Sequence, residues 1–85
     1  MNNEVNREAR RSAGDLLQSV LEGNVSAAEA IEKWPLDSND KLVDRVYGLL
    51  YHLRDDEDIR SKDKRYADWQ FNEFRSLLEE LRREE

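Results

Sequence analysis

Apolar residues recur every three or four positions along most of the chain, and this spacing predicts a series of amphipathic helices. The first predicted helix covers about residues 5–22 and ends at Gly23, because glycine fits the left-handed position that follows a helix. The second begins at the capping sequence Ser26-Ala27-Ala28-Glu29 and stops near Trp34, since Pro35 disfavours helical backbone in the residue before it. This second helix is therefore short.

A longer apolar helix is expected over about residues 39–54, followed by an acidic turn over residues 55–60. Gly48 lies inside that helix, weakens it by about 1 kcal/mol relative to Ala, and would permit close approach of another helix. A last helix starts near Ser61 or Asp63 and runs to about residue 82. Short connections favour antiparallel neighbours. The sequence therefore predicts one all-α domain over residues 1–85, an antiparallel four-helix bundle with a short second helix.

Charge narrows the possible partners. The chain has 85 residues and a net charge of −6, and residues 37–58 alone carry seven acids against three bases. Nucleic-acid binding needs clustered Lys and Arg, so the acidic balance disfavours it. An acidic surface instead suits docking on a basic protein, where opposite fields speed encounter.

The chain has no Cys, so disulfides and thiolate metal sites are excluded. No apolar run approaches the roughly 18 residues that a membrane span requires. The first residues are polar and charged, which is unlike a signal peptide. We expect a protein of the cytoplasm that does not bind membranes.

The acidic run is the main candidate site: Asp55, Asp56, Glu57 and Asp58. These carboxylates could dock Lys or Arg of a partner, or could form a solvated surface turn. Tyr51 precedes them by one helical turn and lies off the apolar stripe, as a recognition residue or a half-buried rim residue. Trp69 points nearly opposite the apolar seam of the last helix, so it is either an interface anchor or a cover for a neighbouring segment.

Catalysis and metal binding are not expected. The spacing that starts at Asp56 places Arg60 and Lys62 at ligand positions of a calcium loop and lacks the required glycine. The only His, His52, has no nucleophile or Glu-x-x-His pattern with it. We therefore predict no catalytic residue, no metal and no cofactor. Arg7, Arg10 and Arg11 form a small basic group that nearby acids dilute.

The order of these segments along the chain is similar to that in a known protein family. The segment Leu21-Glu22-Gly23-Asn24-Val25-Ser26-Ala27-Ala28-Glu29 leads into a short helix and a longer apolar helix. The acidic turn Asp56-Glu57-Asp58-Ile59-Arg60 and a final helix that opens near Tyr66 to Gln70 follow. Over about residues 14 to 82 the chain resembles the bacterial self-protective, colicin-like immunity proteins. Members of that family are small acidic helical bundles that bind and block a cognate toxin, typically a basic nuclease acting on tRNA.

The resemblance implies an inhibitor that occupies a cation-lined nuclease groove. The four acids of residues 55–58 would replace phosphates, and Tyr51 and Trp69 would replace stacked bases or anchor the rim. Such a protein performs no reaction. We expect this chain to be a monomer or a weak homodimer. The alternative is a small structural or regulatory adaptor that self-associates through its last helix, with Trp69 buried in the contact.

Overall fold

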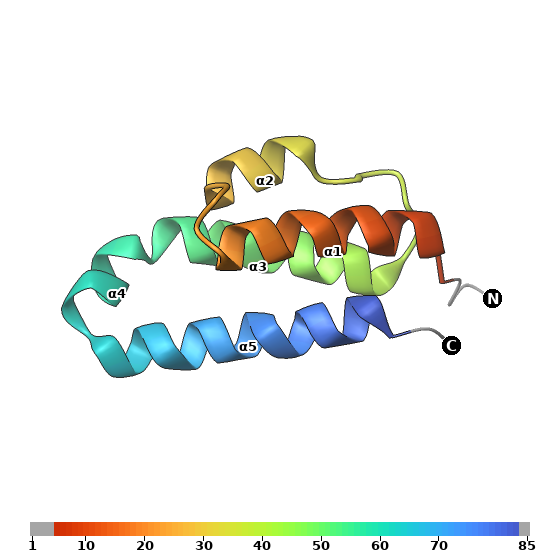
Figure 1. The fold of residues 1–85 in the computed structure, drawn as a ribbon. Coiled ribbons are helices and arrows are strands. Elements are labelled where there is room, and N and C mark those ends of the chain that lie inside the picture. Colours follow the sequence, from red (N-terminus) through yellow and green to blue (C-terminus); the bar gives the residue numbers. More distant parts are fainter. Residues whose placement is uncertain (1–4, 84–85) are drawn as a thin grey trace.

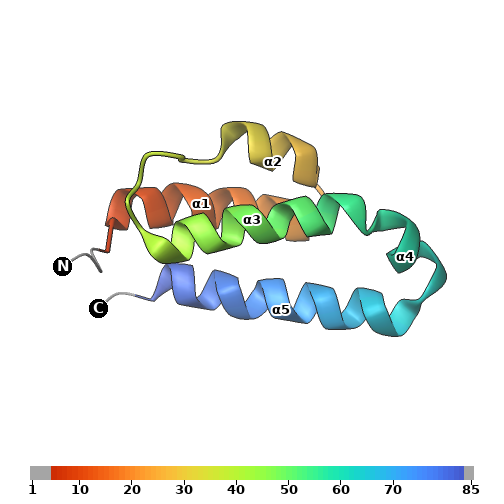
Figure 2. The same cartoon turned by 180° about the vertical axis from the view of Figure 1, so that it is seen from behind.

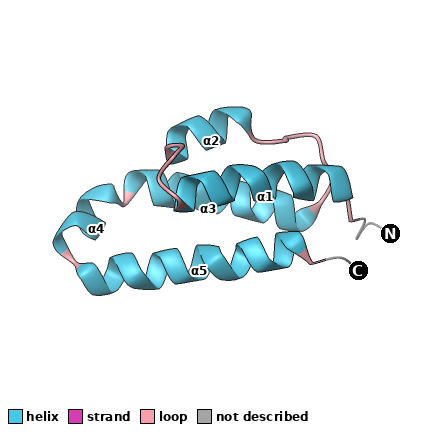
Figure 3. Cartoon of the chain, viewed as in Figure 1, coloured by secondary structure: helices cyan, strands magenta, loops and turns pink. Residues whose placement is uncertain are grey.

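The computed structural model describes residues 5–83 and contains five helices in that range (Figure 1, Figure 3). They are α1 (Arg7–Leu21), α2 (Ala27–Lys33), α3 (Lys41–Asp55), α4 (Glu57–Lys62) and α5 (Lys64–Arg82). The prediction of an all-α fold is confirmed. The four-helix bundle is not confirmed in the form expected, because residues 57–62, which were predicted as the acidic turn and the approach to the last helix, form the additional short helix α4.

Helices α1, α2, α3 and α5 alternate in direction along the chain. Helices α1 and α3 run towards the end of the molecule that carries α4, and α2 and α5 run back (Figure 1, Figure 2). Helix α1 packs along α5, and α2 packs along α3, while α4 bridges α3 and α5. The α3–α4 junction is therefore an end of the molecule, with the first turn of α1 and the last turn of α5 at the opposite end (Figure 2).

Polar caps fix where the helices begin. The side chains of Asn6, Ser26, Asp40 and Asp63 each accept a hydrogen bond from a backbone N–H in the first turn of α1, α2, α3 and α5. The Ser26 cap is the one that the sequence predicts. Each such bond satisfies an N–H that the helix itself leaves without a partner.

Asp40 does more than cap α3. Its side chain is fully buried, and its carboxylate accepts from the backbone N–H of Asn6 at 2.9 Å and from Arg10 Nε at 2.7 Å. Burial alone would raise the pKa of Asp40, but the hydrogen bonds from Arg10, Asn6 and Val43 outweigh it, and the pKa lies below its usual value. Asp40 thus ties the start of α1 to the start of α3.

Apolar side chains from all the long helices form one core. Trp34 is buried, and its indole N–H donates to the backbone carbonyl of Val43 at 3.0 Å. The buried apolar residues are Ala9, Ala13, Leu17, Ala30, Trp34, Val43, Val46, Leu50, Leu53, Phe74, Leu77 and Leu81. The fold is therefore held by packing of α1, α3 and α5, with α2 closing one side.

The glycines do not act as the sequence suggests. A Cβ added at Gly48 would meet nothing within 4 Å, so the predicted close approach of another helix there is wrong within this fold. The crowded glycine is instead Gly14, where an added Cβ would be 3.1–3.3 Å from the guanidinium of Arg82. A side chain of α5 therefore covers α1 at Gly14.

Candidate protein-binding surface

The acidic run lies at the junction of α3 and α4. Asp56 is at once the C-terminal cap of α3 and the N-terminal cap of α4. Its N–H donates to the carbonyl of His52 at 2.8 Å, and its carbonyl accepts from the N–H of Arg60 at 3.0 Å. Glu57 and Asp58 consequently occupy the first turn of α4, where the helix dipole favours negative charge.

The side chain of Asp56 points towards α5. Its Oδ2 accepts from the hydroxyl of Tyr66 at 2.5 Å and from Nε2 of Gln70 at 3.2 Å. The hydrogen bond from the phenol to this carboxylate raises the pKa of Tyr66 above its ordinary value. Two hydrogen bonds therefore engage the Asp56 carboxylate with α5, unlike its acidic neighbours.

Arg60 completes the network from α4. Its Nη1 donates to the carbonyl of Leu53 at 2.6 Å and to Oε1 of Gln70 at 2.7 Å, and its guanidinium lies 5.6 Å from the ring centre of Phe71. The contact to Leu53 satisfies a carbonyl at the end of α3, and the buried Gln70 joins Arg60 to Asp56. Sequence reasoning missed this network, although a Gln among the apolar seam positions of α5 was a signal.

The other three acids point outward. Asp55, Glu57 and Asp58 are exposed. Asp55 pairs with its neighbour Arg54 at 3.0 Å, whereas Glu57 and Asp58 make no ion pair with any residue of the described range 5–83. We call Asp55, Glu57 and Asp58 the acidic corner; two of its charges are fully available to a partner.

Two exposed aromatic rings, one on α3 and one on α5, are linked by contacts to the α3–α4 junction. Tyr51 is 36% exposed, and its ring centre lies 4.9 Å from the guanidinium carbon of Arg54. The ring also packs edge to face on Tyr47, with ring centres 5.3 Å apart. Trp69 is 55% exposed and packs against Tyr66 with ring centres 5.6 Å apart. Thus Tyr51 is joined to Asp55 through Arg54, and Trp69 is joined to Asp56 through Tyr66.

The predictions of no catalysis and no metal rest partly on the single His of the chain. His52 is exposed on α3. Across residues 5–83, no cluster of three or more His, Asp or Glu is placed to hold a metal ion. The predicted absence of a reaction and of a cofactor remains a prediction.

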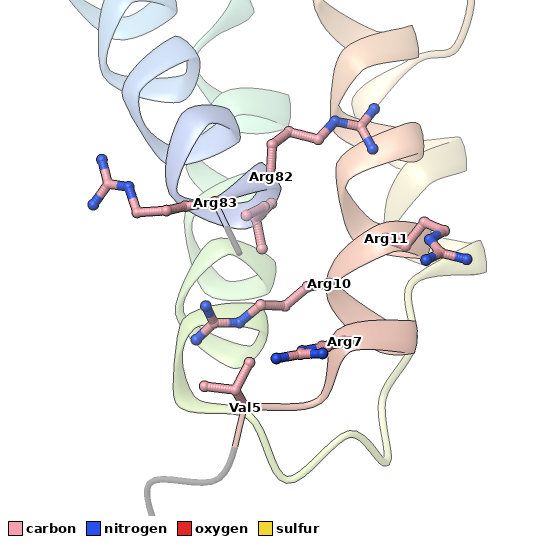
Figure 4. A pocket seen from close by; sticks show the side chains of 7 residues that line it. Val5, Arg7, Arg10, Arg11, Arg82 and Arg83 are labelled. Atoms are coloured by element: carbon pink, nitrogen blue, oxygen red, sulfur yellow. The ribbon is translucent and has the colours of Figure 1, made fainter. Parts of the chain in front are cut away.

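The basic group lies at the opposite end of the molecule and lines a pocket of about 160 Å³ (Figure 4). Val5, Arg7, Arg10, Arg11, Leu81, Arg82 and Arg83 surround it. Arg10 pairs with Asp40, and Arg82 pairs with Asp15 at 3.0 Å. In Figure 4 the guanidinium groups of Arg82 and Arg83 point to opposite sides of the pocket, so these arginines do not converge on one bound group.

Comparison of the chain with models of protein families, with curated proteins and with solved structures gives no match. No helix within residues 5–83 has the length and apolar character needed to cross a membrane.

Proposed function

We propose that this chain is a non-catalytic binding protein that docks its acidic corner on a basic protein. The observation that carries the proposal is that neighbouring acids at the α3–α4 junction point in different directions. Asp56 accepts hydrogen bonds from α5, whereas Glu57 and Asp58 project outward without an ion partner in the described residues. Asp56 is accordingly a positioning residue, and the outward acids are the docking residues.

Fixed geometry makes such a corner effective. The hydrogen bonds of Arg60 and Asp56 hold α4 against both α3 and α5. A rigid group of carboxylates loses little conformational entropy on binding, and it raises the rate of encounter with a cationic surface. Trp69 and Tyr51 would add desolvated contact area at the rim, since exposed aromatic residues are common anchors of interfaces.

From the resemblance to immunity proteins, we propose that the binding inhibits a toxin. The partner would be a basic toxin of nuclease type in a bacterial cytoplasm, and the acidic corner would fill the site that holds nucleic-acid phosphates. Inhibition then follows from occupancy and requires no chemistry from the inhibitor.

The test compares two variants of equal charge. Glu57→Gln with Asp58→Asn removes two negative charges from the corner, and Glu79→Gln with Glu80→Gln removes two exposed charges near the far end of α5. Each form is immobilised and used to capture proteins from the native host. We expect a basic protein that the wild type and the α5 variant retain and the corner variant loses. Equal retention by all three would contradict the proposal.

The exposure of Trp69 keeps a second candidate open, an adaptor that self-associates through α5. It predicts that Trp69→Ala converts a dimer to a monomer in sedimentation experiments. A wild-type chain that sediments as a monomer would exclude it.

A further inference from the structure

The outward face of α3 has a pattern that the core does not explain, and of its residues only Asp55 belongs to the acidic corner. The face is made of exposed residues that recur at helical spacing: Lys41, Asp44, Arg45, Gly48, Tyr51, His52 and Asp55. The residues of α3 that the core buries, such as Val46 and Leu50, lie on the other side of the helix. Gly48 is at the centre of this outward face.

The monomer does not need a glycine at this position. A side chain at residue 48 would meet nothing within 4 Å, and in residues 5–83 only Gly23 among the glycines has a positive φ. Glycine inside a helix weakens it. Its one remaining structural benefit is that another backbone can approach α3 closely, nearer than the usual 8–10 Å between helix axes.

The residues on either side of Gly48 complement one another. Lys41 and Asp55 lie seven residues before and after it, Asp44 and His52 lie four, and Arg45 and Tyr51 lie three. When two copies of a helix cross antiparallel on a two-fold axis, each residue meets the residue at the mirrored position of the other copy. Lys41 of one copy then forms an ion pair with Asp55 of the other. The imidazole of His52 donates a hydrogen bond to the carboxylate of Asp44. The guanidinium of Arg45 lies over the phenol ring of Tyr51.

The charge of the face also suits self-association. Lys41 and Arg45 balance Asp44 and Asp55, although the whole chain carries −6. Two copies can therefore meet here without placing like charges opposite one another, which the acidic corner would do.

We propose that a second copy of this chain docks antiparallel on the outward face of α3, with Gly48 on the two-fold axis. This dimer does not require the proposed partner to exist, because its contacts leave out Glu57, Asp58 and Trp69. It would, however, cover Tyr51 and Asp55 of both copies. Dimer and partner complex would then compete for these two residues, and dilution or partner binding would release the monomer.

Charge exchange tests the register. Sedimentation equilibrium of the full chain at low salt, from micromolar to millimolar concentration, should give a monomer–dimer equilibrium. Lys41→Glu and Asp55→Lys should each weaken the dimer about fivefold or more, and the double variant should recover it, because the mirrored positions then pair again. The control Lys62→Glu makes the same charge change as Lys41→Glu on α4 and should leave the dimer within about twofold. A chain that stays monomeric throughout, or a double variant without recovery, would overturn the proposal.

A cross-link tests the axis. The chain has no Cys, so Gly48→Cys introduces a single thiol, and the open space around residue 48 accepts it. Mild oxidation should join two copies through residue 48, since a disulfide requires Cα atoms about 4.4–6.8 Å apart. Ser76→Cys, on the exposed side of α5, should cross-link at least tenfold more slowly. Equal rates, or a dimer that Trp69→Ala dissociates and Gly48→Gln does not, would overturn the proposal in favour of contact through α5.

Discussion

Replacement of Gly48 by Ala should make the monomer more stable. Residue 48 is exposed in the middle of α3, with helical backbone and with no atom near the added methyl group. The gain therefore comes from helix propensity and from the reduced entropy of the unfolded chain, about 0.5–1 kcal/mol. For a chain of this size that corresponds to a rise in melting temperature of about 3–6 °C.

The other two glycines provide matched comparisons. At Gly23, with φ of +81°, Ala must adopt the left-handed conformation, and we expect a loss of about 1 kcal/mol. At Gly14 the added methyl group must displace the guanidinium of Arg82, which disturbs its contacts with Asp15 and Gln18. That cost offsets the gain in propensity, so the net change at Gly14 should be within about 0.5 kcal/mol of zero.

Urea unfolding followed by circular dichroism measures all three variants. Low micromolar protein keeps self-association out of the measurement, and an unchanged dependence on urea concentration shows that the unfolded surface is the same. The expected order of stability is Gly48→Ala above wild type and Gly14→Ala, with Gly23→Ala lowest. A Gly48→Ala variant that gains nothing would mean that residue 48 does contact something in the monomer, and would refute both this reasoning and the open face on α3.

Three further predictions concern polar groups that form hydrogen bonds within the fold. Asp40→Asn leaves Arg10 without its charged partner and should lower the free energy of unfolding by about 3 kcal/mol, whereas the exposed Asp44→Asn should change it by less than about 0.5 kcal/mol. Because the folded pKa of Asp40 lies below its usual 3.8, its stabilisation is complete above that value and is lost as the pH falls through the folded pKa. Below pH 3.8 the wild type should thus lose stability more steeply than Asp40→Asn in urea titrations, and equal slopes would count against the buried pair. Asp56→Asn should lower the pKa of Tyr66 towards 10.0, as followed by ultraviolet absorbance with Tyr66→Phe as reference; an unchanged titration would place Asp56 away from the phenol. Trp34→Phe removes the hydrogen bond to Val43 and part of the core, and a loss of less than about 0.5 kcal/mol against an expected 2 kcal/mol would contradict its buried position.

Local chemistry in the sequence was enough to find the long helices. The Ser26 cap, the stop at Pro35 and the apolar spacing of α1, α3 and α5 are all short-range signals, and the observed bounds agree with them closely. The exposure of Trp69 also follows from its position on a helix. These features depend on residues within one or two turns of each other.

The α3–α4 junction could not be predicted in this way. Whether residues 57–62 form a turn or a helix depends on Arg60 reaching Leu53 and Gln70, and on Asp56 reaching Tyr66. Those contacts join residues 7 to 10 positions apart across a change of chain direction. The same long-range packing decides which glycine is crowded, so Gly14 rather than Gly48 lies in a helix contact.

The rate of association with a purified partner tests the central claim most directly. The corner variant, Glu57→Gln with Asp58→Asn, should bind the captured basic protein more slowly than wild type at low salt, and the difference should shrink as salt screens the charges. Dissociation should change less, and Glu79→Gln with Glu80→Gln should associate nearly as fast as wild type. An association rate that is the same for the corner variant and wild type at low salt would contradict the account.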